Sequence, residues 1–447
     1  MHLILLSGGS GKRLWPLSNE IRSKQFLQLL PGPDGQFESM VQRVYRQLKE
    51  VGGWSSITVA AGAAQKDQLQ MQLGNDVNIV IEPERRDTFP AIVLACSYLY
   101  SKMNVGEEEP IAILPVDPFV DIEYFHNIAR FPSIIENQPE GLVLMGAKPS
   151  FPSEKYGYVV PAERDLEIAK VSHFKEKPNA VLAQGLIDQG GLWNCGVFGL
   201  RMGYILDILR SKYGIREFGY EQMEGEFFNL NKTSFDYEVV EHAKEISVLR
   251  YPGQWKDLGT WETLTEEMAD RSFGNVRIDE TCTNTHVINE QTLPVIAMGL
   301  DNAVVVASRD GILVAEKGET YRLKEFVKDM DARPMFEEKR WGRYTVLEHS
   351  CYEDGSEALT KKLTIDQGKQ ISYQYHLKRK EVWTILRGEG LLYMEDEKKP
   401  IIAGDVIRIE ERQRHGIRAI TDLEIIEVQY GHPLIEEDIV RLEMEWE

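Results

Sequence analysis

The chain has 447 residues, which is enough for two or three domains with a sizeable buried core. Its composition, 43% apolar and 27% charged, is that of an ordinary globular protein. The formal net charge of −20 argues against non-specific binding to nucleic acid or to an anionic membrane, because the mean field repels both. A local cationic pocket is still compatible with this charge, since Lys12, Arg13, Arg22 and Lys24 fall close together.

The cysteines and the apolar segments indicate in which cellular compartment the protein is expected. Four cysteines are widely spaced and form no Cys-x-x-Cys pair, which predicts reduced, structural thiols: Cys96, Cys195, Cys282 and Cys351. Met1 leads directly into a strand-like run, and no segment approaches the roughly 20 apolar residues that a membrane span needs. We therefore expect a cytoplasmic protein with neither a nucleic-acid nor a membrane partner.

The first part of the chain alternates predicted strands with predicted helices. Strand patterns occupy residues 3–7, 56–62, 78–83 and 111–117, and helical patterns occupy 36–51 and 91–100. This alternation predicts βαβ units and an α/β domain with a mostly parallel sheet, whose ligands bind at the carboxyl ends of the strands. A glycine-rich loop, Glu82 and Asp117 all fall at such ends.

Beyond about residue 270, the pattern of alternating strands and helices ends. Short β-rich runs are separated by turn residues, and a charged stretch over 316–340 predicts a linker helix that breaks at Pro334. From Trp341 onward, short strands and glycine turns predict a small β-sandwich or barrel. The expected domains are therefore residues 1–268, a β-rich connecting segment over 269–335, and residues 336–447.

The loop in LILLSGGSGKRLWP (3–16) does not fit two familiar phosphate-binding motifs. A Walker A loop needs Ser or Thr after its Gly-Lys pair, but Arg13 follows Gly11-Lys12. A dinucleotide fingerprint needs a third small residue, and Leu14 stands there instead. The remaining interpretations are an ordinary strand-to-helix turn and a cradle of backbone N–H groups beside two cations, suited to a triphosphate.

Longer motifs decide between these interpretations. LSGGSGKRLWPLS…SKQF (6–26) resembles the opening motif of the sugar-1-phosphate nucleotidyltransferases, and its Trp15-Pro16 and Lys24-Gln25-Phe26 resemble the mannose-1-phosphate guanylyltransferase branch. Further motifs follow in the order of that family: EPERRDTFPAI (82–92), LPVDP (114–118), KYGYV (155–159), FKEKP (174–178), LWNCGVF (192–198), SFDYEVVE (234–241) and WKDLGTW (255–261). The resemblance covers residues 1 to about 265 and implies a Rossmann-like (GT-A-like) fold.

The resemblance implies formation of GDP-mannose and pyrophosphate from GTP and α-D-mannose 1-phosphate. In such a reaction a sugar-phosphate oxygen attacks the nucleotide α-phosphorus, so no protein nucleophile is needed. Catalysis then depends on positioning two anions and neutralising the charge that develops.

The family's functional residues carry over to matching positions. The triphosphate is expected to contact Gly8, Gly9, Gly11, Lys12 and Arg13, with Arg13 as the main stabiliser of the transition state. Lys24 should reach a nucleotide phosphate, and Asp117 and Asp257 should hold Mg²⁺. The nucleoside side of the pocket is expected at Glu82, Arg86 and Asp87. The sugar phosphate is expected at Lys177, and the sugar hydroxyls at Gly157, Glu176 and Asn194.

Structural roles compete with some of these assignments. Asp117 and Asp257 could cap strand ends, Arg86 could serve in a structural ion pair, and Asp236 could be a helix N-cap. The chain also departs from the family pattern. Pro118-Phe119 stand where a small residue and His are usual, and Asp87 stands where Asn is usual. Both departures bear on nucleotide or sugar preference.

The C-terminal part resembles a cupin. In GKQISYQYHLKRKEVWTILRGEG (368–390), Gln374 replaces the first His of the cupin motif, while His376, Glu381 and Gly388 are in register. Gly404 and His415 fit a weaker second motif. The resemblance implies a set of ligands for Zn²⁺ or another divalent metal: Gln374, His376, Glu381 and His415.

The cupin resembles the type II phosphomannose isomerase domain in particular. RWGRY (340–344) and IEEDIVRLE (435–443) match its two ends, and Arg379 is retained, but Leu377, Lys378 and Val382 stand where histidines are usual. Two interpretations stay open here: an isomerase that interconverts mannose 6-phosphate and fructose 6-phosphate, and a non-catalytic cupin kept for folding or assembly.

Alternatives for the whole chain also stay open. One is a different pairing of nucleotide with a hexose- or heptose-1-phosphate. Another is a catalytically silent sugar-nucleotide-binding protein, against which the intact Arg13, Lys24, Asp117, Lys177 and Asp257 argue. The resemblance also allows a homodimer, with 270–330 as the candidate interface.

Overall fold

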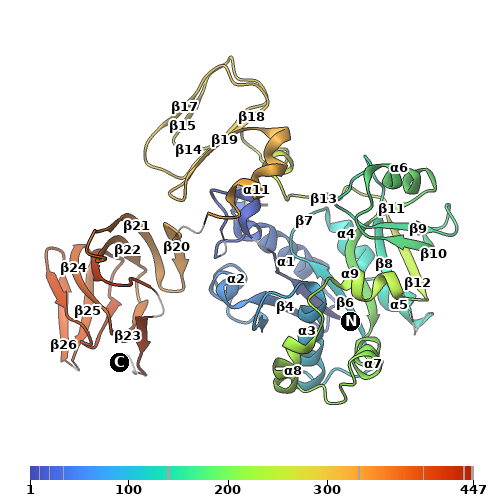
Figure 1. Ribbon diagram of the computed structural model, residues 1–447, viewed down its shortest axis with the longest axis horizontal. Coiled ribbons are helices and arrows are strands. Elements are labelled where there is room, and N and C mark those ends of the chain that lie inside the picture. The colour runs from blue at the N-terminus through green and yellow to red at the C-terminus, as the bar shows by residue number, and fades with distance from the viewer. Residues whose placement is uncertain are drawn as a thin grey trace.

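The chain forms three bodies, which the computed structural model places side by side (Figure 1). An α/β domain is followed by a projecting stack of short strands and then by a β-sandwich at the C-terminal end (Figure 1). The described residues are 1–9, 11–19, 21–33, 35–137, 141–330, 333–395, 397–435 and 438–443.

A nine-stranded sheet forms the centre of the first domain. Its strands, in spatial order, are β5 (Asn78–Glu82), β4 (Ser56–Gly62), β1 (His2–Leu6), β6 (Pro110–Pro115), β11 (Leu192–Arg201), β8 (Leu142–Ala147), β12 (Ile246–Tyr251), β10 (Ile168–Lys175) and β9 (Tyr158–Pro161). The first four strands are parallel, as the sequence predicts, whereas β11 runs antiparallel to both of its neighbours β6 and β8. The parallel arrangement therefore covers one half of the sheet, and the other half is mixed.

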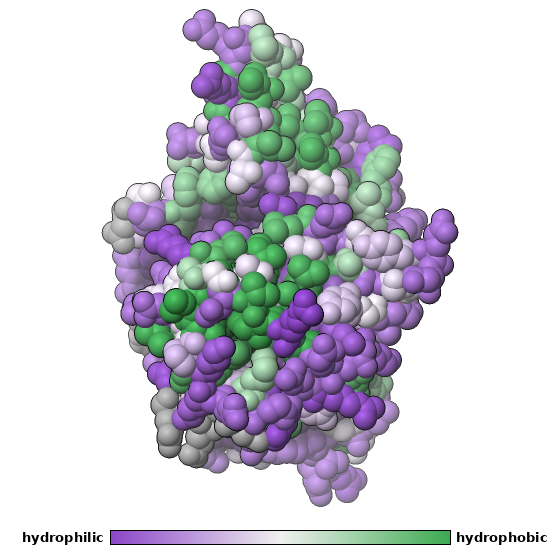
Figure 2. All heavy atoms as spheres, turned by 90° about the vertical axis from the view of Figure 1, so that its left-hand side faces the viewer, coloured by the Kyte–Doolittle hydropathy of each residue, from purple (hydrophilic) through white to green (hydrophobic). Residues whose placement is uncertain are grey.

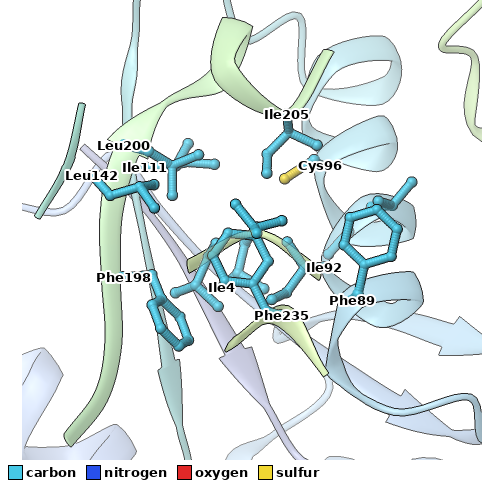
Figure 3. Packing of buried hydrophobic residues seen from close by; sticks show 14 of the residues in the cluster. Ile4, Phe89, Ile92, Cys96, Ile111, Leu142, Phe198, Leu200, Ile205 and Phe235 are labelled. Carbon is cyan, nitrogen blue, oxygen red and sulfur yellow. The ribbon is translucent and has the colours of Figure 1, made fainter. Parts of the chain in front are cut away.

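Helices cover both faces of this sheet. They are α1 (Met40–Val51), α2 (Lys66–Leu73), α3 (Thr88–Lys102), α4 (Ile122–Ile128), α5 (Phe131–Glu136), α6 (Ala180–Asp188), α7 (Met202–Lys212), α8 (Tyr220–Glu226) and α9 (Phe235–Glu238). A further helix, α10 (Trp261–Thr265), packs instead with Leu14 and Leu17. On β1, Ile4 packs with Phe89 and Ile92 of α3 (Figure 3), while Leu3 and Leu5 pack on the opposite side with α1 and α4. Burial on both faces explains why this strand is apolar throughout.

The first helix begins later than its apolar pattern predicts. The expectation of a helix from residue 36 is wrong for its first four positions, because α1 starts at Met40. Ser39 caps it by accepting a hydrogen bond from the Gln42 N–H, and the Gln42 side chain accepts one from the Ser39 N–H. This capping box fixes the helix start. Phe37 belongs instead to β3 (Phe37–Glu38), paired with β2 (Leu30–Pro31).

The connecting segment is a small parallel β-helix. Its strands are β14 (Ser272–Gly274), β15 (Val276–Ile278), β16 (His286–Asn289), β17 (Val295–Ala297), β18 (Ala303–Ala307) and β19 (Ile312–Glu316). β14, β16 and β18 stack in parallel, and so do β15 and β17. Val304 and Val306 pack against Leu14 and Leu17 of the first domain. The β-helix therefore rests directly on the segment that follows the glycine-rich loop.

A short helical stretch leads from the β-helix to the last domain. The linker helix expected over 316–340 is confined to η6 (Lys317–Arg322) and α11 (Leu323–Val327). Across the domain boundary, Arg340 Nε lies 3.0 Å from Asp67 Oδ1, and the Gln68 side chain donates to the Glu338 carbonyl. Helix α2 therefore faces the last domain, as Figure 1 shows.

The last domain is a β-sandwich, as the cupin resemblance predicts. One sheet contains β20 (Phe336–Lys339), β21 (Gly342–Cys351), β22 (Glu357–Ile365), β29 (Leu423–Gly431), β24 (Arg379–Arg387) and β27 (Val406–Ile409). The other contains β26 (Glu397–Ile402), β25 (Glu389–Met394), β28 (His415–Ala419), β23 (Gln370–His376) and β30 (Ile439–Arg441). Trp383, Ile385 and Ile417 belong to the core between them.

The surface near the last domain carries polar and apolar side chains together (Figure 2). Figure 2 views the molecule from the side of the last domain, where apolar and polar side chains are interspersed and a group of apolar ones gathers near the middle of the face. All four cysteines are free: Cys96, Cys195 and Cys282 are buried, and Cys351 is exposed. Within the described part of the chain, no helix combines the length and apolar character that crossing a membrane requires.

Candidate functional site

A cavity of about 350 Å³ opens at the carboxyl ends of β1 and β6, where the sequence predicts the ligand. Many of the predicted site residues line it together: Gly8, Gly9, Arg13, Lys24, Asp117, Lys177, Asn194 and Asp257. Its volume lies at the lower end of the range of about 300–1,000 Å³ for small-molecule sites. The fold therefore brings residues from the whole first domain into one pocket.

The loop after β1 presents backbone to this cavity. Gly8 and Gly9 are exposed, and a Cβ on either would meet nothing within 4 Å. Gly9 has a φ of +140°, a conformation that favours glycine. The chain then enters η1 (Gly11–Leu14), which carries Lys12 and Arg13. The neighbouring Ser10 lies outside the described residues.

Two carboxylates and one ammonium group meet at the floor of the cavity. Lys24 Nζ lies 2.8 Å from Asp117 Oδ2 and 3.1 Å from Asp257 Oδ1. The two aspartates are adjacent because β7 (Pro118–Phe119) and β13 (Lys256–Asp257) form an antiparallel pair in which Asp257 opposes Pro118. Their side chains are 28% and 30% exposed, so both carboxylates face the cavity.

Electrostatics keep Lys24 and Asp257 charged. Burial lowers the pKa of Lys24, but Asp117 and Asp257 outweigh that effect and raise it above its ordinary value. Burial likewise raises the pKa of Asp257, but Lys24 and Arg13 outweigh it and hold the pKa below its ordinary value. Lys24 and Asp257 therefore form an ion pair at neutral pH.

Gly259 allows Arg13 to approach this cluster. A Cβ on Gly259 would lie 3.1 Å from Asp257 Oδ1 and 3.3 Å from Arg13 Nη1, which is closer than ordinary van der Waals contact. The glycine of the WKDLGTW motif thus leaves room for a guanidinium beside a carboxylate.

The wall of the cavity that Lys177 and Asn194 form holds two of the residues expected to bind the sugar or its phosphate, whereas Gly157 and Glu176 do not line the cavity. Asn194 Nδ2 donates to Asp236 Oδ1 at 2.8 Å, and its Oδ1 accepts from the Gly196 N–H. The register of β11 against β8 shifts between Asn194 and Phe198, a strand irregularity of the kind that re-aims side chains at sites. Burial, and next the charge of Glu176, raise the pKa of Asp236 to about 7.

Lys177 and Glu176 form an ion pair beside this wall. Lys177 Nζ lies 2.9 Å from Glu176 Oε1, and Glu176 is buried. Lys177 has a φ of +44°, which is uncommon for a residue with a side chain. A Cβ on Gly157 would overlap Glu176 Oε2, so only glycine permits this arrangement.

Asp236 is not the helix N-cap. Ser234 caps α9 by accepting from the Tyr237 N–H, and Asp236 lies within the helix with its carboxylate turned to Asn194. The N-cap role for Asp236 is therefore wrong, and the residue instead holds Asn194, which lines the cavity.

Other predicted site residues do not line the cavity. Lys12 points away from it and donates to the Met330 carbonyl at 3.3 Å. Arg86 donates to the Phe228 and Leu230 carbonyls and lies 3.3 Å from Glu84, which is the structural role weighed against a nucleotide contact. Asp87 caps α3 by accepting from the Thr88 N–H.

Glu82 lies at the end of β5 and is buried. Burial raises its pKa to about 7, while Arg85 opposes this rise and Asp87 adds to it. A carboxyl that holds its proton near neutral pH can donate as well as accept a hydrogen bond.

The segment after the phosphate loop is held by hydrogen bonds from α10 and from the β-helix. The Trp15 carbonyl accepts from the Trp261 indole at 2.9 Å, and the Pro16 carbonyl accepts from Ser308 Oγ at 2.9 Å. Asp310 accepts from the Asn19 side chain with Oδ2 and from the Met335 N–H with Oδ1. One carboxylate therefore joins the loop segment to the chain that enters the cupin.

The predicted cupin ligands also come together. The ligand atoms of His376, Glu381 and His415 lie within 4.8 Å of one another, and Gln374 pairs with His415 across β23 and β28. His415 Nδ1 lies 2.9 Å from the Gln413 carbonyl, so Nδ1 carries the proton and Nε2 faces the cluster as an acceptor. Among the described residues, Nε2 has no hydrogen-bond partner. This donor set fits a divalent transition metal.

Arg379 shares this cluster. Its Nε donates to Glu381 Oε1 at 3.0 Å, and Nη2 lies 3.4 Å from His376 Nε2. Glu381 Oε2 also accepts from the Trp383 indole at 3.0 Å. A buried guanidinium therefore partly neutralises the carboxylate that a metal would use.

A cleft of about 870 Å³ lies in front of this cluster, between the cupin and α2. Its lining contains six cationic side chains but only two carboxylates, those of Asp67 and Glu427. The cations are Lys339, Arg340, Lys361, Lys369, Arg379 and Arg441. Such a lining favours an anionic ligand.

Comparison with known families identifies the first domain. Residues 2–272 match the Nucleotidyl transferase family, and residues 330–444 match the family Mannose-6-phosphate isomerase C-terminal. The first match alone covers more than half of the chain. The chain belongs to the nucleotidyl transferase family.

Full-length relatives of this nucleotidyl transferase share both parts. The Xanthan biosynthesis protein XanB of Xanthomonas campestris pv. campestris (strain B100) is 31% identical over 98% of this chain and 97% of its own length. The mannose-1-phosphate guanylyltransferase of Escherichia coli (strain K12) is 28% identical over 99% of this chain and 97% of its own length. A crystal structure from Thermus thermophilus, described as a mannose-1-phosphate geranyltransferase, is 26% identical with a TM-score of 0.63, covering 74% of this chain and 99% of that one.

The pocket of this nucleotidyl transferase contains residues that the sequence analysis did not single out: Lys155, Tyr156, Gly196 and Trp255. Tyr156 packs edge-on against Trp193 and Trp255, with ring centroids 5.0 and 5.1 Å apart. Lys155 and Tyr156 open the KYGYV motif and Trp255 opens WKDLGTW, so the motifs already contained the signal.

Proposed function

We propose that the chain transfers a guanylyl group from GTP to α-D-mannose 1-phosphate, forming GDP-mannose and pyrophosphate. The observation that carries this proposal is the convergence of Lys24, Asp117 and Asp257 with Arg13 and the glycine loop in one pocket. The name of the Escherichia coli relative, a mannose-1-phosphate guanylyltransferase, supports the choice of substrates.

The chemistry needs no nucleophile from the protein. A phosphate oxygen of the sugar attacks the α-phosphorus in line, the bond to the β-phosphate oxygen breaks, and pyrophosphate leaves with the electron pair. Charge grows on the oxygens around the α-phosphorus, and the side chains of Arg13 and Lys24 are placed to stabilise it. The backbone of Gly8 and Gly9 lets the phosphates approach closely.

The two aspartates fit a magnesium ion. Asp117 and Asp257 converge on one cation, Lys24, and hard carboxylate oxygens suit Mg²⁺. We assign these two residues as its ligands. When bound, the ion supplies positive charge at the nucleotide phosphates.

The wall that Lys177 and Asn194 form would orient the sugar. Lys177 supplies a cation for the sugar phosphate, while Asn194 and Glu176 present hydrogen-bonding groups to the sugar hydroxyls. Lys12, Arg86 and Asp87 have structural partners, so we assign them to holding the loops around the pocket.

A grid of substrates tests this proposal. Purified chain with Mg²⁺ is incubated with GTP, ATP, UTP or CTP, each with mannose 1-phosphate, glucose 1-phosphate or a heptose 1-phosphate, and pyrophosphate release is measured. The proposal expects the highest kcat/KM for GTP with mannose 1-phosphate. No turnover of that pair would refute it, and a better pair elsewhere in the grid would replace it.

We also propose that the cupin interconverts mannose 6-phosphate and fructose 6-phosphate. The supporting observation is the buried His376, Glu381 and His415 cluster behind a cleft lined by cations. Gln374 and these three residues would hold a divalent transition metal, which polarises a substrate carbonyl when bound. The cationic lining would bind the sugar phosphate.

The isomerase proposal has its own assay. The chain loaded with Zn²⁺, Co²⁺ or Mn²⁺ is given mannose 6-phosphate, and fructose 6-phosphate is measured. Activity that disappears in His376→Ala, while guanylyl transfer persists, would assign it to the cupin. No activity with any of the three metals would refute the proposal and leave a non-catalytic cupin.

A further inference from the structure

A second cluster of metal-binding side chains lies at the end of the cupin. His349, Cys351 and Glu357 offer ligand atoms that all lie within 4.8 Å of one another. Glu357 Oε2 lies 3.0 Å from His349 Nε2, and its Oε1 lies 3.0 Å from Nδ1 of His432. One carboxylate is thus held between two imidazoles, with a thiol beside it.

The sheet register fixes these four residues. Cys351 and Glu357 are directly opposed in the β21–β22 pair, and His349 lies two positions before Cys351 on the same face. Glu357 also opposes Gly431 of β29, which places the following residue, His432, beside it. The turn between Cys351 and Glu357 is closed by backbone hydrogen bonds and by Asp354, which accepts from the N–H and hydroxyl of Ser356.

This cluster is separate from the predicted cupin metal site. His349 lies on β21 and Glu381 on β24, with β22 and β29 between them. Three strand spacings amount to about 14 Å. The two clusters share no residue, so an ion in one would not occupy the other.

We propose that His349, Cys351, Glu357 and His432 bind a zinc ion. They supply one thiolate sulfur, two imidazole nitrogens and one carboxylate oxygen, which is a complete tetrahedral set for Zn²⁺. Bonds of about 2.0–2.3 Å place such ligand atoms about 3.3–3.8 Å apart, so His349, Cys351 and Glu357, whose ligand atoms lie within 4.8 Å of one another, need only small side-chain shifts. His432 lies outside that group, 3.0 Å from the other oxygen of Glu357, and its exposed side chain must turn inward to complete the set. The thiolate selects a transition metal over Mg²⁺ or Ca²⁺.

The ion would brace the cupin. It joins β21, β22 and the end of β29, and β29 carries Gln429, whose side chain donates to Glu381 at 3.3 Å. Gly431 also opposes Arg379 of β24, so the brace reaches the strand that carries both Arg379 and Glu381. On binding, the metal replaces the thiol proton of Cys351, and each imidazole binds through a neutral nitrogen.

Cobalt titration of the full-length chain tests this site. Metal is first removed with a chelator, Mg²⁺ is added in excess, and Co²⁺ is titrated while the thiolate-to-cobalt charge-transfer absorption is recorded. Cys351 is the exposed thiol, and the other three cysteines are buried elsewhere, so this absorption reports the proposed site. We expect the absorption to saturate at one equivalent in His376→Ala, where the other cluster no longer competes for the metal, and to be displaced by Zn²⁺. Binding should also raise the melting temperature of the cupin.

Matched variants make the result decisive. Cys351→Ser and His349→Ala should abolish the charge-transfer absorption, whereas His376→Ala in the other cluster and His126→Ala on the surface of α4 should retain it. Guanylyl transfer by Cys351→Ser should equal that of wild type, which shows a folded chain and keeps this test independent of the proposed function. No absorption at saturating Co²⁺, or its persistence in Cys351→Ser, would overturn the assignment.

Discussion

Lys24 and Asp257 are 233 positions apart in the chain, yet Lys24 Nζ lies 3.1 Å from Asp257 Oδ1. The same ammonium group lies 2.8 Å from Asp117 Oδ2. Lys24 follows the phosphate loop, Asp117 follows β6, and Asp257 ends β13, so three separate segments meet at one point. Binding of a triphosphate and a metal would redistribute these charges, which is the physical basis of the first prediction.

Asp257→Asn should strongly reduce guanylyl transfer. The substitution removes one charge that holds Lys24 and one proposed ligand of Mg²⁺, while the size of the side chain stays nearly the same. Loss of a single group that stabilises developing charge typically costs about 10²–10³ in kcat. Steady-state kinetics with GTP and mannose 1-phosphate measure the effect. Asp270→Asn, at an exposed position outside the pocket, is the matched control.

Gly157→Ala should raise the KM for mannose 1-phosphate. The new methyl group would overlap Glu176 Oε2 and displace that carboxylate from the sugar side of the pocket. We expect an increase of about tenfold, equivalent to about 1.4 kcal/mol, with little change in the KM for GTP. Gly185→Ala in α6 is the control, because its Cβ meets nothing within 4 Å. Equal effects on both substrates would contradict a sugar-specific role.

Glu82→Gln should change how stability depends on pH. Burial raises the pKa of Glu82 to about 7, above its unfolded value of about 4.5, so the folded state binds the proton more tightly. Stability contributed by this proton is therefore present at low pH and is lost as pH rises from about 4.5 to 7. The shift corresponds to about 3 kcal/mol.

Urea unfolding at pH 4.5 and pH 8 measures this difference. The loss of stability with rising pH should be smaller in Glu82→Gln than in wild type, and Glu84→Gln, at an exposed position, should behave like wild type. An identical pH dependence in wild type and Glu82→Gln would show that Glu82 ionises normally in the folded chain.

Asp310→Ala should loosen the phosphate loop from the β-helix. It leaves the Asn19 amide and the Met335 N–H without their acceptor, which costs about 1–3 kcal/mol where these groups are shielded from water. We expect kcat to fall by about tenfold or more, because small displacements of positioned groups slow such reactions. Unchanged kcat together with lowered stability would assign Asp310 a purely structural role. Glu280→Ala, at an exposed position of the β-helix, is the control.

The sequence predicts the strands and loops of the parallel half of the sheet because their patterns are local. It does not show where consecutive side chains of a tight turn point. Lys12 and Arg13 are neighbours in η1, where successive residues differ in direction by about 120°, so Arg13 faces the pocket while Lys12 contacts the linker.

Strand pairing between residues far apart in the sequence also could not be predicted from the sequence. The β-rich segment is recognisable from its composition, but the parallel stacking of β14, β16 and β18 depends on registers between distant residues. The cupin ligands are recognisable because their spacing is a known motif. His349 and His432 belong to no such motif, since a sheet contact alone brings them together. The homodimer and the cytoplasmic location stay predictions.

The most direct test of the central claim is identification of the product. Wild-type chain is incubated with GTP, mannose 1-phosphate and Mg²⁺, and the mixture is analysed by mass spectrometry and phosphorus NMR. We predict GDP-mannose and pyrophosphate in equal amounts, abolished by removal of Mg²⁺ and strongly reduced in Asp257→Asn. Absence of GDP-mannose, or its undiminished formation by Asp257→Asn, would contradict the account.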